Sequence, residues 1–349
     1  MRLKLILTLL LIQLVLPIRA DALEIAAPAV PESGRELMAE GADTFGEGLA
    51  LILKDAVYLL RPDLAEASAS CFTVLGAVLL VSLLKGLPGT AEKMCELTGA
   101  VCVSGALLAG MNSLIRLGSQ TVGELSEYGK LLLPVMTTAL AAQGGVTASA
   151  ALYTGTALFN SLLGSLITGV LNPLIYIYLA FSAVNSAVGD DMLKKLRDLV
   201  KWLMTWCLKT ILYVFTGYMS ITGVVSGSTD AATLKATKLT ISGMVPVVGG
   251  ILSDASEAVL VSAGLAKNAA GVYGILAILA VSLGPFLRIG IHYLMLKATA
   301  AISAVFGSKR ITDLIADFSS AMGLLLAMTG TQSLLLLIST VCFLREVGI

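Results

Sequence analysis

Charge is scarce in this chain, and the two signs are balanced. Charged residues make up 13% of the 349 residues and hydrophobic residues 57%, whereas ordinary soluble domains carry about 25% charged residues. Lys plus Arg and Asp plus Glu number 23 each, so the sequence predicts no polyanionic partner. Aromatic residues are only 6% and no basic stripe with interleaved aromatic residues occurs, which argues against a nucleic-acid-binding surface.

The residues of common catalytic and metal sites are also sparse. His292 is the single histidine, and the sequence contains no HExxH, no G-x-S-x-G and no P-loop motif. The five cysteines form no CxxC pair and lie in or beside apolar runs, as buried thiols do: Cys71, Cys95, Cys102, Cys207 and Cys342. We therefore expect no enzymatic activity, no cofactor and no metal, so any energy must come from a gradient or a partner.

Long apolar runs dominate what is present, and the mean hydropathy is +0.91. The runs are rich in Leu, Ala, Val and Gly and lack the alternation of a membrane β-barrel. The sequence thus predicts an all-α fold, a polytopic transmembrane helical bundle. The candidate spans are 71–87, 95–117, 131–147, 150–170, 173–189, 202–224, 243–263, 269–285, 286–306 and 318–343. The spans 131–147 and 243–263 are candidates for broken or re-entrant helices.

The N-terminal part is organised differently from the rest. Residues 1–22 have a basic start, a short apolar run and the A-x-A pattern Ala20-Asp21-Ala22, which predicts a cleavable signal peptide; the alternative is an uncleaved first transmembrane helix. Residues 23–66 are predicted to be an extracytoplasmic amphipathic and polar segment, or a connecting linker. Residues 67–349 form the multi-span membrane domain.

The distribution of basic residues predicts the orientation. With the mature N-terminus outside, the basic loops fall on the cytoplasmic side: they carry Lys85, Lys93, Lys194, Lys195, Arg197, Lys201, Lys309 and Arg310. A loop carrying Glu124 and Glu127 is predicted to lie outside. This agreement with the positive-inside rule favours counting both doubtful spans as full crossings.

Spaced prolines indicate an internal duplication. Pro134 and Pro246 are each followed by valine and lie 112 residues apart, and Pro173 and Pro285 repeat that spacing. Two matching prolines are informative because the chain has nine in total. The predicted units are 95–206 and 207–330. Such repeats can be parallel or inverted, and in transporters the working site lies near the repeat interface.

A break inside an apolar span is the candidate site. Its proline and glycines, which bend or interrupt a helix, are Gly243, Pro246, Gly249 and Gly250. Asp254 and Glu257 follow, three residues apart on one helix face. Facing lipid, the two acids would together cost about 5–7 kcal/mol, so they must face protein or water.

Three interpretations of these acids stay open, one of which is a solvent-exposed loop. They could line a pore or couple transport to protons or cations, or they could pair with a basic residue of another helix, for which Arg288 and His292 are the candidates. Close packing of small residues is an alternative role for the glycines. Pro134 marks the equivalent break in the first repeat, where no acid follows.

The run from Leu239 to Gly250 (LTISGMVPVVGG), followed by Ser253-Asp254-Ala255 and by Lys267-Asn268-Ala269-Ala270-Gly271, resembles the core of the stage III sporulation protein AE family. The resemblance implies a role in endospore formation, within a multi-protein assembly made in the mother cell and placed in the membrane around the forespore. With a forespore-made partner, that stage III sporulation A complex bridges two membranes. The resemblance implies a membrane channel or export-platform component, served by a sister ATPase, with no catalytic residues of its own.

The leading hypothesis is therefore a polytopic membrane subunit of a transenvelope channel or export complex. The alternative is a stand-alone secondary transporter in which Asp254 and Glu257 are the coupling acids.

Overall fold

The computed structural model describes residues 28–35, 37–38, 45–84, 90–142, 146–221, 269–306 and 308–347. The elements in these ranges are α2 (Glu32–Arg35), α3 (Phe45–Leu83), α4 (Thr90–Ala142), α5 (Val146–Leu166), the π-helical turn η2 (Ile167–Leu171), α6 (Asn172–Val188), α7 (Asp191–Ile221), α10 (Ala269–Phe306) and α11 (Lys309–Val347). The described residues contain no strand, and the predicted all-α membrane fold is confirmed.

In the part of the chain that the structure describes, six long apolar helices can cross a membrane, fewer than the spans expected for the same part. They are Phe45–Leu83, Met94–Ala139, Ser149–Val188, Asp191–Met219, Gly271–Phe306 and Lys309–Leu344. Three pairs of expected spans are joined, because 95–117 continues into 131–142 within α4, 150–170 and 173–188 lie in α5 to α6, and 269–285 and 286–306 lie in α10. The signal peptide and the span 243–263 lie outside the described residues.

The described helices continue through proline. Pro134 lies inside α4 and Pro285 inside α10, so the break expected at Pro134 does not interrupt α4. Membrane helices tolerate proline because neighbouring groups and local adjustments satisfy the freed backbone groups. Pro173 shows the adjustment directly: its ring would crowd the carbonyl four residues back, at Gly169, and Gly169 lies in the wider turn η2.

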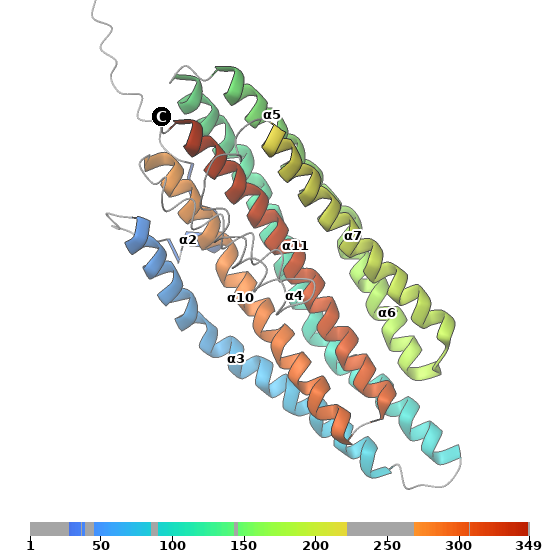
Figure 1. Ribbon diagram of the computed structural model, residues 1–349. Coiled ribbons are helices and arrows are strands. Elements are labelled where there is room, and N and C mark those ends of the chain that lie inside the picture. The colour runs from blue at the N-terminus through green and yellow to red at the C-terminus, as the bar shows by residue number, and fades with distance from the viewer. Residues whose placement is uncertain are drawn as a thin grey trace, which may run out of the picture.

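Helix α11 forms the centre of the bundle. In its most apolar window 94% of the residues are buried, against 22–50% in the other five long helices. It packs on α10, α4, α5, α6 and α7, and Figure 1 shows it running between α10 and α7. Glycines bring α4 close to it, because a Cβ at Gly118 or Gly129 would lie 2.6 Å from Leu325 or Leu336.

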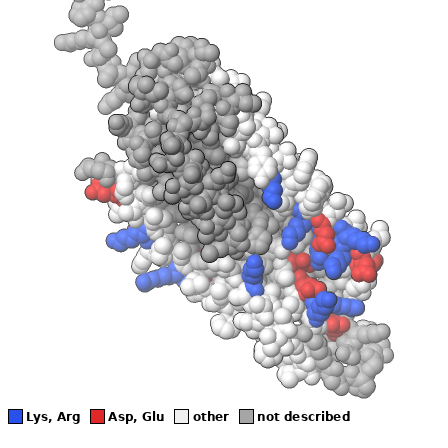
Figure 2. All heavy atoms as spheres, in the orientation of Figure 1, with Lys and Arg blue, Asp and Glu red and all other residues white. Residues whose placement is uncertain are grey.

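The connections between helices near which the basic residues lie are at one end of the bundle. Ser82 donates to the carbonyl oxygen of Phe306 (2.5 Å) and Ser186 to that of Arg310 (3.1 Å). Arg310 in turn lies 3.8 Å from Glu96 at the start of α4. Figure 2 shows mixed charges gathered at the α6–α7 turn.

By the positive-inside rule, the basic residues of these turns predict that this end faces the cytoplasm. Each merger of two expected spans removes one crossing, and two mergers precede α7, so the side predicted for its basic residues is unchanged. The predicted outer loop carrying Glu124 and Glu127 is wrong, since both residues lie inside α4.

The polar N-terminal segment is partly built into the bundle. Val30 and Leu37 are buried, and a Cβ at Gly34 would lie 2.7 Å from the side chain of Val281 in α10. Helix α3 runs through residue 66 without a break. Pro173 and Pro285 lie in helices that run in the same direction (Figure 1), while Pro246 is outside the described residues, so the duplication stays a prediction.

Candidate functional site

The predicted helix break lies outside the described residues, so its geometry stays a prediction. It comprises Gly243, Pro246, Gly249, Gly250, Asp254 and Glu257. The two predicted basic partners, Arg288 and His292, are described and lie on α10. Their surroundings form the first candidate site.

Arg288 bridges α10 to two carboxylates of α3. Its Nη2 donates to Glu66 Oε2 at 3.2 Å, and its Nε lies 3.2 Å from Asp63 Oδ1, within ion-pair distance but without hydrogen-bond geometry. Asp63 and Glu66 are three residues apart, the same spacing as Asp254 and Glu257, so that both acids reach one guanidinium. From the sequence, the α3 pair falls in the predicted polar outer segment, and no local signal indicates its ion pair with Arg288.

A pocket of about 250 Å³ adjoins this ion pair between α3, α4 and α10. Its walls include the buried side chains of Cys71, Met111 and Leu296, while Glu66 and His292 supply polar groups. The Nδ1–H of His292 donates to the carbonyl oxygen of Arg288 at 3.0 Å, since a carbonyl can only accept. Most of the lining is apolar, and Ser70 and Thr73 add hydroxyl groups to the polar part.

The pocket does not have the composition of a catalytic centre. Among the described residues, no three His, Cys, Asp or Glu side chains are placed to hold a metal ion. The imidazole of His292 is bound to backbone rather than to a nucleophile. What the described residues offer here is a paired charge cluster inside long apolar helices, a feature that marks functional positions in membrane proteins.

A second ionic cluster, which sequence reasoning missed, joins α7 to α11 near the cytoplasmic end. The Arg197 guanidinium binds Asp317 of α11 through Nη1 and Asp198 through Nε and Nη2, at 3.0 and 2.8 Å. The Tyr178 hydroxyl of α6 donates to Asp317 at 3.4 Å. Only 9% of the Arg197 side chain and 14% of the Asp317 side chain are exposed, so this pair is a buried one.

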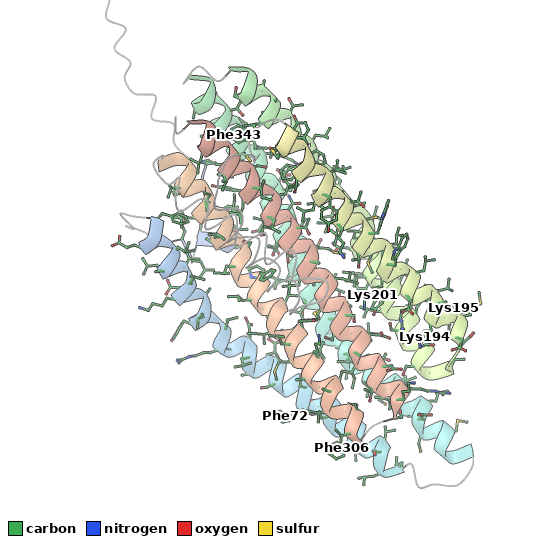
Figure 3. All side chains as sticks on the ribbon, in the orientation of Figure 1. Phe72, Lys194, Lys195, Lys201, Phe306 and Phe343 are labelled. Carbon is green, nitrogen blue, oxygen red and sulfur yellow. The ribbon has the colours of Figure 1, made fainter. Side chains whose placement is uncertain are left out.

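The basic run on α7 divides between the solvent side and the protein side. Lys195 points away from the bundle, whereas Lys201 lies toward α11 (Figure 3), where its Nζ donates to Ser320 Oγ at 3.1 Å. The sequence signal for this difference is spacing, because Arg197 and Lys201 are four residues apart and share a helix face. The run is therefore partly a structural connection and not only an orientation signal.

A third polar group lies in the core of the bundle. Gln332 of α11 donates to Asn160 Oδ1 of α5 at 2.6 Å, and Asn160 donates to the Ser126 carbonyl oxygen of α4 at 2.9 Å. Both amide side chains are buried. This chain of hydrogen bonds fixes the register of three helices, a frequent role of polar residues between membrane helices.

Comparison with known proteins adds an independent finding. The family model described as stage III sporulation protein AE matches residues 52–345. The chain is 22% identical over 236 residues to the stage III sporulation protein AE of Bacillus subtilis (strain 168), an alignment that covers 67% of this chain and 59% of that protein. The chain thus spans less than two thirds of the length of this relative. No solved structure matches the chain significantly.

Proposed function

Because its residues 52–345 match the family model, the chain belongs to the stage III sporulation protein AE family, and we propose that it is a polytopic membrane subunit of the mother-cell-to-forespore channel or export complex. The family gives the chain a role in sporulation, and its six candidate spans make it a multi-pass membrane protein. In this proposal it resides in the mother-cell membrane that surrounds the forespore. Its partners are the other stage III sporulation A subunits and their forespore-made partner.

The centre of the bundle is filled, which favours a role as one subunit of a complex over a channel formed by this chain alone. In the described residues the axis is occupied by α11, whose apolar window is 94% buried. A conducting path along that axis would require α11 to leave a closely packed core, which is costly. We infer that cargo passes beside the described bundle or between subunits, and that the chain itself performs no catalysis.

A stand-alone secondary transporter is the second candidate. The observation that favours it is the group formed by Arg288, Asp63 and Glu66, with His292 beside it, inside the membrane-crossing helices. Ionisable residues at such positions often mark ion or substrate pathways. In that case Asp254 and Glu257 would supply the coupling acids.

Two readouts on one set of variants separate these proposals: sporulation efficiency and recovery of partner subunits with the tagged full-length chain. A complex subunit should co-purify with the other sporulation proteins, and Asp254→Asn should leave both readouts near those of the unaltered chain. The matched control is Asp313→Asn, which changes an exposed carboxylate of α11.

A transporter should instead lose sporulation after Asp254→Asn while retaining its abundance and any partners. Failure to recover partner subunits with the unaltered chain would overturn the complex proposal. Loss of sporulation in Asp254→Asn alone, with partners retained, would favour the transporter.

A further inference from the structure

One face of α4 is polar over a length in which a lipid-facing helix would be apolar. Between Leu108 and Leu131 the helix exposes no large hydrophobic side chain. We call this surface the polar face; it comprises Asn112, Ser113, Arg116, Gln120, Glu124, Glu127 and Lys130, of which Glu124 is half-buried and the others exposed. These positions recur every three or four residues, so they form one stripe along the helix.

The opposite flank of the bundle is apolar at the same height. The hydrogen bond from Asn160 to the Ser126 carbonyl oxygen fixes the level of α5 against α4, and Phe159 contacts Phe215 with ring centroids 5.4 Å apart, which fixes α7. At this level α5 exposes Leu158 (61%) and Leu162 (50%). On α7 the residues next to Phe215 are likewise exposed and uncharged: Tyr213 and Val214.

The polar face of α4 and the apolar flank of α5 and α7 are suited to different surroundings, water and lipid respectively. Helix α5 contains no Asp, Glu, Lys, Arg or His over its length, so its exposed leucines are suited to hydrocarbon. If that flank contacts lipid, the polar face lies at bilayer depth as well, because the helices are held in register. Exposed charges at that depth are stable only next to water or a polar partner.

The charges of the polar face are largely satisfied within the chain. Lys130 pairs with Glu127 at 2.6 Å, Gln120 donates to Glu124 Oε1 at 2.8 Å, and Ser33 of α2 donates to the other oxygen of Glu124. With Arg116, the face holds two cations and two anions and thus no net charge. A protein partner is not needed to neutralise it, which favours water as its neighbour.

We propose that the polar face of α4 contacts water within the membrane-crossing part of the bundle and forms one wall of a hydrated path. Because the wall has no net charge, it fits neutral or zwitterionic polar solutes better than ions of one sign. This inference rests on the register of the helices and does not depend on membership of a sporulation complex. A second protein covering the face is the competing explanation.

Cysteine accessibility tests the proposal on the full-length chain in lipid vesicles. The native cysteines are first replaced by serine or alanine: Cys71, Cys95, Cys102, Cys207 and Cys342. Gln120→Cys then probes the polar face, and Leu162→Cys, within about one helical turn of the same height, is the matched control on the apolar flank. Asp190→Cys, at an exposed turn, gives the rate for a water-exposed position.

The probe is a charged maleimide present on both sides of the membrane. We expect Gln120→Cys to react at a rate close to that of Asp190→Cys, and Leu162→Cys to react only with a lipid-soluble maleimide. Equal labelling of both flanks by the charged reagent would overturn the proposal, because that height would then lie outside the bilayer. Failure of Gln120→Cys to react would also overturn it.

Labelling in native membranes of sporulating cells distinguishes water from a protein neighbour. Reaction of Gln120→Cys in both preparations supports a hydrated path in the working protein. Reaction in vesicles of the pure chain but protection in native membranes shows that another protein covers the face, and this outcome overturns the hydrated path. Monodisperse elution of each variant and retained reactivity at Asp190→Cys in each preparation verify the fold.

Discussion

Asp317 and Asp198 bind the same guanidinium but should differ widely in their contribution to stability. The Asp317 side chain is 14% exposed and connects α11 to α7, whereas the Asp198 side chain is 56% exposed and lies next to Arg197 on α7. Asp317→Asn removes the buried charge partner and leaves Arg197 with the exposed one. Asp198→Asn removes a partner that water already screens.

The structure sets the size of each effect. Breaking a buried ion pair from one side costs about 3–5 kcal/mol, mainly because the remaining charge stays buried and unpaired. Since Asp198 still binds Arg197, we place Asp317→Asn at the lower end, about 3 kcal/mol, or roughly a hundredfold in the unfolding equilibrium. Asp198→Asn should cost about 1 kcal/mol or less, as surface pairs do.

The assay is the free energy of unfolding of the purified chain in bicelles, measured for both variants under one condition. A third variant, with Arg197→Met and Asp317→Leu together, should recover much of the loss because it removes both charges. Equal small losses for Asp317→Asn and Asp198→Asn would refute the reasoning, since they would show that the Arg197–Asp317 pair is hydrated. No recovery in the double variant would show that the site does not tolerate apolar packing.

Two further predictions concern backbone and core. Gly189→Ala should cost about 1–3 kcal/mol of unfolding free energy, because Gly189 has φ +76° and an added Cβ would lie 2.7 Å from Arg310; Gly46→Ala, where nothing lies within 4 Å, is the control and should not destabilise. Gln332→Met should cost about 0.6–1.7 kcal/mol by breaking the bond to Asn160, as thermal unfolding in bicelles would measure, and an unchanged midpoint would contradict the role given to this hydrogen bond.

Composition was sufficient to predict the class of the fold, but not the number of crossings. The scarcity of charge and the long apolar runs follow directly from the cost of placing charge in hydrocarbon. Two span boundaries fell at Pro173 and Pro285, and a break was expected at Pro134, where proline interrupts isolated helices. In the bundle α4 and α10 continue through their prolines, and a π turn accommodates the third, which single-sequence rules do not anticipate.

The partners of the charged residues could not be predicted because they are distant in sequence. Arg288 pairs with Glu66 at a separation of 222 residues, and Arg197 with Asp317 at 120. Sequence reasoning named Arg288 only as a possible partner for Asp254 and Glu257, since charges inside a membrane are stabilised by pairing. It chose Asp254 and Glu257 because their segment has the most unusual composition, and no local signal distinguished Asp63 and Glu66 from surface acids.

The central position of α11 has a consequence for how the protein is made. Of the described helices it is the last to leave the ribosome, and five earlier ones pack around it. Before α11 is inserted, the earlier helices therefore lack their central neighbour. Small residues of α4 that contact α11, such as Gly118 and Gly129, are not yet covered. A premature stop codon just before residue 309 should consequently be as damaging as one near the start, because it deletes the element that the others enclose.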